Sequence, residues 1–166
     1  MRRIGVLRIA VLVSVFIFIV GCSKESDKNL KTIQTYLEYE FTGPSDELIN
    51  ALKQEGAYPP ELQAYVEENY KPLVADLENF VLKNFTLIHL RTAYEKGYHL
   101  KPTNIDIQKI DGIKEDAYDY EVSVEYTKDE QTNTANVTGI INLNENGKIS
   151  VIRNLDDGGL LEKMQK

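Results

Sequence analysis

The sequence predicts an α+β domain in which several helices precede an antiparallel sheet of about four strands. In the first half of the chain, apolar residues recur every three or four positions, which is the helical period. After Pro102 they recur every second position, which is the period of a half-buried strand. Because the helices come first and do not alternate with the strands, the pattern favours α+β over a parallel α/β sheet.

The helical half is expected to run from Leu30 to about Gly97. Gly43-Pro44 ends the first helix, and Ser45 with the acidic residues after it begins the second. A further helix is expected over Thr86 to Tyr94, with a short buried strand as the alternative. The apolar stripes of the four earlier helices are Leu30, Ile33, Leu37 and Phe41; Leu48, Ile49 and Leu52; Leu62, Tyr65, Val66 and Tyr70; and Leu73, Val74, Leu77, Phe80, Val81 and Phe85.

The strand half contains one segment of strict alternation. From Tyr118 to Tyr126, tyrosines and valines alternate with charged or polar residues, which indicates an antiparallel strand with one buried face. Two further strands, 137–143 and 148–153, flank the sequence Asn-Glu-Asn-Gly, whose Asn-Gly pair is a strong hairpin signal. Ile105 and Ile107 indicate a strand before these three.

The N-terminus has the composition of an export signal. Arg2, Arg3 and Arg8 precede an apolar stretch from Ile9 to Val20, whose 12 residues are fewer than the roughly 20 that span a bilayer. An uncleaved membrane anchor and cleavage to a freely secreted protein are the alternatives. The small residue Gly21 follows the apolar stretch, and Cys22, the only cysteine, comes directly after it and excludes an internal disulfide framework.

The run Ile19-Val20-Gly21-Cys22 resembles the lipobox of bacterial lipoproteins, in which Val20 is a tolerated residue. The resemblance implies that a diacylglyceryl group is attached to the sulfur of Cys22 and that a signal peptidase cuts before it. Two acyl chains anchor a protein stably, whereas one does so only marginally. The implied organisation is a signal peptide over 1–21, a lipidated cysteine and polar tether over 22–29, one domain over 30–155, and a C-terminal tail over 156–166.

The charge of the chain restricts its partners. Removing the first 21 residues leaves 145 and changes the formal net charge from −7 to −10. Such an acidic domain is not expected to bind nucleic acid or anionic lipid headgroups through surplus lysine and arginine. The expected attachment to the membrane is therefore the lipid on Cys22, on the extracytoplasmic side of the cell membrane.

Helices followed by a twisted antiparallel sheet, from Leu30 to Leu155, resemble the nuclear transport factor 2-like superfamily. The resemblance implies helices packed into a curved sheet to form a cone, and small Gram-positive lipoproteins are the expected relatives. A cystatin-like arrangement is the competing fold. Some superfamily members are enzymes and others are not, and no motif of the enzymatic members is present, so no catalytic residue is predicted.

Few side chains carry a chemical signal. His89 and His99 belong to no metal-binding motif and are expected to be packed or surface residues, so no metal or cofactor is predicted. Tyrosine is unusually frequent, and we expect a group of tyrosines to line a cavity with amphipathic walls. The candidate cavity residues are Tyr36, Tyr39, Tyr65, Tyr94 and Tyr120.

The function expected from these observations is that of a membrane-anchored, non-enzymatic module that binds an envelope protein or a small ligand. The alternative is a cavity enzyme, an isomerase or hydrolase, in which a tyrosine and a carboxylate perform acid–base chemistry. The acidic turn Asp156-Asp157-Gly158-Gly159 is interpreted as an exposed turn before the C-terminal tail.

Overall fold

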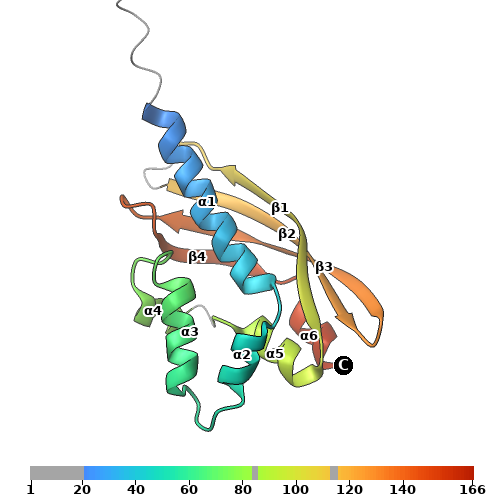
Figure 1. Ribbon diagram of the computed structural model, residues 1–166. Helices are drawn as coiled ribbons and strands as arrows, with labels where there is room; N and C mark the ends of the chain where they lie inside the picture. The colour runs from blue at the N-terminus through green and yellow to red at the C-terminus, as the bar shows by residue number, and fades with distance from the viewer. Residues whose placement is uncertain (1–20, 84–85, 113–115) are drawn as a thin grey trace, which may run out of the picture.

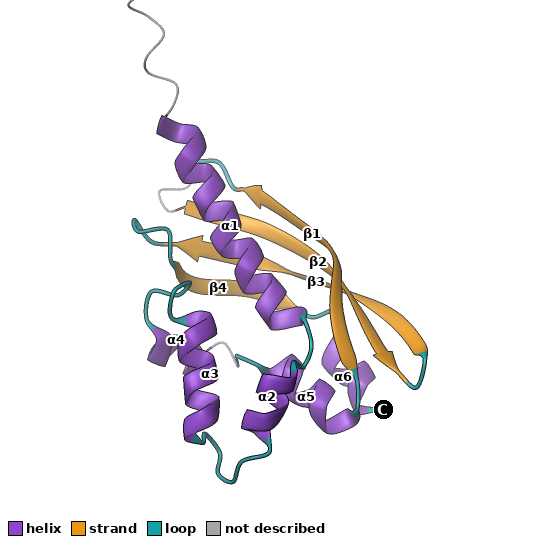
Figure 2. Cartoon of the chain, in the orientation of Figure 1, coloured by secondary structure: helices purple, strands orange, loops and turns teal. Residues whose placement is uncertain are grey.

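The computed structural model describes residues 21–83, 86–112 and 116–166 and has the predicted α+β architecture, with helices preceding a four-stranded open antiparallel sheet (Figures 1 and 2). The helices are α1 (Gly21–Phe41), α2 (Asp46–Leu52), α3 (Pro60–Tyr70), α4 (Leu77–Lys83), α5 (Ile88–Lys96) and α6 (Leu160–Gln165). The strands are β1 (His99–Lys109), β2 (Asp116–Lys128), β3 (Gln131–Leu143) and β4 (Ile149–Asp156).

The strands form a meander in the order β1-β2-β3-β4, and each antiparallel pair is adjacent in sequence. Strand β2 confirms the predicted alternation, because its tyrosines and valines from Tyr118 to Tyr126 are buried. Its acidic residues Asp119 and Glu121 are exposed on the opposite face. The sheet therefore has an inner, apolar face and an outer, polar face.

Helix α1 lies diagonally across the inner face of the sheet (Figure 1). Ile33 and Leu37 are completely buried, and Phe41 nearly so, which confirms the predicted stripe of the first helix. This stripe and the inner face of β2 belong to one hydrophobic core. Burial of these apolar side chains is the main stabilising contribution to the fold.

The expected polar tether over 22–29 is wrong as a description of this segment, because α1 begins at Gly21 and passes through it. The side chain of Asn29 is 3% exposed and donates to the Tyr118 hydroxyl at 3.2 Å and to Asp116 at 3.4 Å. These contacts to β2 hold the helix down before its apolar stripe begins. The folded domain therefore starts earlier than Leu30.

The expected helix over Leu73 to Phe85 is shorter in the structure. Only Leu77–Lys83 is helical, and Phe85 lies outside the described residues. Val74 instead forms a parallel bridge with Ile149, in which the Ala75 N–H donates to the Ile149 carbonyl at 2.8 Å. Pairing with β4 satisfies backbone groups that a helix would otherwise satisfy, so tertiary contact overrides the local periodicity.

The predicted helix over Thr86 to Tyr94 is confirmed as α5, which ends at Gly97 in the left-handed conformation, with φ of 76°. Glycine adopts that conformation without the steric cost that a Cβ imposes. The hairpin between β3 and β4 is also confirmed, with Gly147 at φ of 73°. These local signals were sufficient because each depends on a few adjacent residues.

The expected C-terminal tail is wrong over its last turns, because residues Leu160–Gln165 form α6. Leu160 and Met164 are 0% and 1% exposed and belong to the hydrophobic core. The acidic turn before this helix is therefore the start of a packed element. The folded domain continues through α6.

Candidate functional site

The five candidate cavity tyrosines do not share one environment. Tyr36, Tyr65 and Tyr120 are buried, whereas Tyr39 and Tyr94 are half-buried. Burial is the main cause that raises the pKa of each of these three hydroxyls, and the charge of one nearby carboxylate, that of Glu40, raises it further. It places Tyr94 on α5, outside the packed core.

The rings around Glu40 pack edge to face. Tyr36 meets Tyr70 with ring centroids 6.2 Å apart and an interplanar angle of 75°, and it meets Phe80 at 5.7 Å and 87°. The ring of Tyr39 is tilted against that of Tyr70 at 6.2 Å. Such pairs add about 0.5–1.5 kcal/mol each beyond their buried area. These tyrosines therefore contribute to stability, and the expected ligand cavity stays a prediction.

Glu40 is the unusual group in this cluster, because its side chain is only 5% exposed. The backbone N–H of Leu87 donates to the carboxylate, while Oε1 is buried and has no hydrogen-bond partner in the described part of the chain. Burial raises the pKa of Glu40 from 4.5 to about 7, against the opposing effects of Tyr70 and the Leu87 N–H. Near neutral pH this carboxyl therefore exists in both protonation states.

The Tyr70 hydroxyl lies beside Glu40 and is itself buried without a regular hydrogen bond among the described residues. Burial and the charge of Glu40 together hold the pKa of Tyr70 and of Tyr36 well above the ordinary value. Burial likewise raises the pKa of Tyr120. The phenols are neutral at physiological pH, so Glu40 is the group of this cluster that exchanges a proton there.

Sequence reasoning missed Glu40, although a signal was present. It stands seven residues after Ile33 and three after Leu37, which places it on the same face of α1 as the apolar stripe. A carboxylate in that position must be buried if the stripe is buried. The carboxyl and the phenols form what we call the Glu40 cluster: Tyr36, Glu40, Tyr65, Tyr70 and Tyr120.

His89 is packed, as expected, but it has an acidic neighbour from the far end of the chain. Its ring lies 5.2 Å from that of Phe41, and its Nε2 is 3.8 Å from Oδ2 of Asp157. Burial lowers the pKa of His89, and Asp157 opposes this in part. The histidine is therefore predominantly neutral at pH 7. His99 is exposed at the start of β1.

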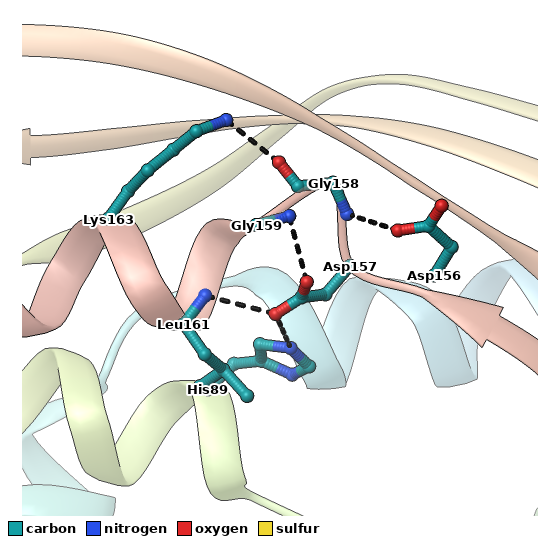
Figure 3. A network of polar contacts seen from close by, with 7 residues as sticks. All are labelled: His89, Asp156, Asp157, Gly158, Gly159, Leu161 and Lys163. Carbon is teal, nitrogen blue, oxygen red and sulfur yellow. Dashed lines mark hydrogen bonds and ion pairs between the residues drawn. The ribbon is translucent and has the colours of Figure 1, made fainter.

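Asp157 has a structural task at the start of α6. Figure 3 shows its carboxylate between the backbone of that helix and the His89 ring. It accepts hydrogen bonds from the N–H groups of Gly159 at 2.8 Å and Leu161 at 3.0 Å, which are otherwise free at a helix start. The Asp156 carboxylate similarly accepts from Gly158 N–H at 2.9 Å. The turn is built to begin α6.

The proposed lipidation segment lies at the edge of the described chain. Ile19 and Val20 are outside the described residues, while Gly21 and Cys22 are the first two residues of α1. In the part of the chain that is described, no helix has the length and apolar character needed to cross a membrane. Nor do the described histidine, cysteine, aspartate and glutamate residues gather in groups of three suited to a metal ion.

No protein-family model and no curated protein matches the chain. A solved structure of similar fold is TraH, a proposed transfer protein from the Gram-positive conjugative plasmid pIP501, determined in solution by NMR. The two share 12% sequence identity with a TM-score of 0.50, over 76% of this chain and 91% of TraH. At that identity the likeness concerns the fold alone.

Proposed function

We propose that this protein is a bacterial lipoprotein, anchored by lipid on Cys22 to the extracytoplasmic side of the cell membrane. In this proposal its domain is a non-enzymatic module of the nuclear transport factor 2-like kind, which binds an envelope protein or a small ligand. The observation that carries the proposal is the run Ile19-Val20-Gly21-Cys22 at the end of a basic and apolar N-terminal segment.

The geometry of α1 defines how such an anchor would hold the domain. The buried Asn29 follows Cys22 by seven positions, and the whole stretch between them lies within the helix. At 1.5 Å per residue these positions span about 10 Å, compared with roughly 25 Å for an extended tether of that length. The helix would therefore carry the anchor rigidly and keep the domain close to the lipid headgroups.

The interior of the domain supports binding through its surface. The tyrosines and the carboxylate suited to acid–base chemistry are packed into the core, where Tyr70 is completely buried and Glu40 nearly so. A substrate would have to displace packed aromatic rings to reach them. Packed interiors resist such displacement, because even one additional methylene is costly.

A second candidate function, the cavity enzyme, is favoured by one observation. The Glu40 cluster combines a carboxyl of pKa about 7 with neutral phenols, which is the combination that general acid–base catalysis uses at neutral pH. We place it second because the carboxyl is 5% exposed. If the protein catalyses a reaction and Glu40→Gln retains that activity, Glu40 is not its general acid or base.

Metabolic labelling with radioactive palmitate in the native host tests the anchor. The wild-type chain is expected to take up the label, and Cys22→Ala is expected to lose it and to leave the membrane fraction. Ser23→Ala, which changes the adjacent residue and keeps the thiol, is the matched control and should remain labelled. An unlabelled wild-type chain, or a labelled Cys22→Ala chain, would contradict the proposal.

A further inference from the structure

The outer face of the sheet, which points away from α1, has a hollow of about 380 Å³. Its walls come from all four strands, and β4 contributes Asn154. The side chains that define it are Asp106 and Gln108 of β1, Asp119 and Glu121 of β2, and Thr138 and Ile140 of β3. We call this region the outer-face hollow. Tyr120 is the member of the Glu40 cluster that lines it.

Three carboxylates are concentrated in this hollow. In the register of the sheet, Asp106 stands directly opposite Glu121, and Asp119 lies two residues from Glu121 on the same face. Like charges directly opposite each other on neighbouring strands destabilise a sheet. The amide of Gln108 donates to Asp106 at 3.0 Å, which satisfies an oxygen but leaves the charge uncompensated.

The nearby cations are directed elsewhere. Arg153 of β4 stands opposite Ile140 of β3. Its Nη2 donates to the side-chain carbonyl of Asn142 at 2.8 Å. Lys109, at the end of β1, pairs with Asp116 at 2.7 Å. Among the described residues, no lysine or arginine lies within ion-pair distance of the three carboxylates of the hollow. In the described chain, the three carboxylates therefore form no ion pair.

We propose that the outer-face hollow docks a lysine- or arginine-rich segment of a partner protein. The proposal rests on the function proposed above, a binding module, and names the chemistry of its partner. Cationic side chains complement the three carboxylates, and their apolar stems can lie on the half-buried Ile140. A second copy would bring the same negative charge to the same place, and an anionic lipid surface would also be repelled.

The position of the hollow is compatible with an anchored domain. Helix α1 crosses the inner face, and the proposed lipid on Cys22 is attached to the beginning of that helix. The outer-face carboxylates are exposed on the other side of the sheet. A domain held close to the membrane through α1 therefore keeps this face open to a neighbouring protein.

A fluorescein-labelled octalysine peptide can serve as the probe, titrated with the full chain purified from whole-cell extract in non-ionic detergent. The wild-type chain should bind it with an affinity that falls as salt is raised. The variant Asp106→Asn/Asp119→Asn/Glu121→Gln should bind roughly tenfold more weakly or worse, because each exposed pair contributes up to about 1 kcal/mol.

The matched control is Glu55→Gln/Glu68→Gln/Glu95→Gln, which removes three exposed carboxylates from the helical part of the molecule. Its affinity should stay within about twofold of the wild type, because its removed charges lie outside the hollow. Equal loss in both triple variants would show that only net charge matters and would overturn the proposal. Absence of octalysine binding would overturn it as well.

Carbodiimide cross-linking of octalysine to the wild-type chain gives a reading that does not depend on a folded variant. The cross-links are expected on the carboxylates of the hollow, and cross-links spread over the helices would contradict the proposal. Because Cys22→Ala retains the hollow, it should bind octalysine normally. Failure of the lipid anchor and failure of the docking surface are therefore distinguishable.

Discussion

Replacing Glu40 by glutamine should make the stability of the domain less dependent on pH. The glutamine keeps the shape of the side chain but carries no charge at any pH. In the wild type, the carboxyl has a pKa of about 7 when folded and about 4.5 when exposed. Glu38, on the same helix and exposed, provides the matched variant Glu38→Gln.

The raised pKa of Glu40 determines whether the free energy of unfolding of the wild type rises or falls with pH. Well below pH 4.5 the carboxyl is protonated in both the folded and the unfolded chain, so it does not make the free energy of unfolding depend on pH. As the pH rises from there to about 7, the unfolded chain releases its proton more readily, and folding loses stability. One pKa unit corresponds to about 1.4 kcal/mol, so the total loss by pH 8 is about 3 kcal/mol.

Urea unfolding of the wild type, Glu40→Gln and Glu38→Gln at several values between pH 4.5 and 8 provides the assay. The stability of Glu40→Gln relative to the wild type should rise with pH, by about 3 kcal/mol in total. The contribution of His89, whose lowered pKa acts in the opposite sense, is common to all three proteins and cancels in the differences.

The reasoning would be refuted by a difference between Glu40→Gln and the wild type that stays constant across this range. The carboxyl would then titrate at the same pH in the folded and unfolded chain, which is incompatible with a desolvated interior position. A pH-dependent difference of the same size in Glu38→Gln would refute it too, because that side chain is exposed.

Three further substitutions test the packing, each by urea unfolding at pH 7. Gly139→Ala should lose about 1–3 kcal/mol, because its new Cβ would come within 2.9 Å of the Tyr120 ring, and a stability equal to the wild type would show that the ring moves freely. Leu160→Ala should lose about 2–5 kcal/mol, because this side chain is completely buried. The control Leu155→Ala should change stability by about 0.5 kcal/mol or less, because Leu155 is 51% exposed. Equal changes in the free energy of unfolding of the two variants would mean that α6 is not packed. Asp157→Ala should lose about 1 kcal/mol through the two N–H groups that its carboxylate accepts from, while Asp157→Asn retains most of this; equal loss in both would implicate the charge.

The parts of the fold that were predicted correctly depend on signals within one element. The alternation from Tyr118 to Tyr126 and the stop at Gly97 need no knowledge of the rest of the chain. The order of helices and strands, and with it the α+β class, followed from such signals. Only the finer choice of superfamily needs the way in which the layers pack.

The errors occurred where a distant contact decides the structure. Val74 leaves the helical pattern because it pairs with Ile149, and α6 forms where Leu160 can enter the core. The early start of α1 is held by Asn29 on β2. A polar segment with one well-placed asparagine has the composition of a linker, so periodicity alone could not identify it.

The candidate sites show the same division. The run that ends at Cys22 consists of adjacent residues and can be recognised from the sequence alone. The outer-face hollow can be recognised only once the strand register that places Asp106 opposite Glu121 is known. The alternation in β2 predicted that its acidic residues share one face. It could not predict which cations lie beside them, because Arg153 and Lys109 come from other strands.

The mass of the N-terminal tryptic peptide of the membrane-extracted protein tests the central claim most directly. A lipid-anchored chain is expected to begin at Cys22 and to yield Cys22-Ser23-Lys24 with a diacylglyceryl group on the sulfur. A peptide that contains Ile19 and Val20 joined to an unmodified Cys22 would contradict the anchor. A mature chain that begins after Cys22 would contradict it equally.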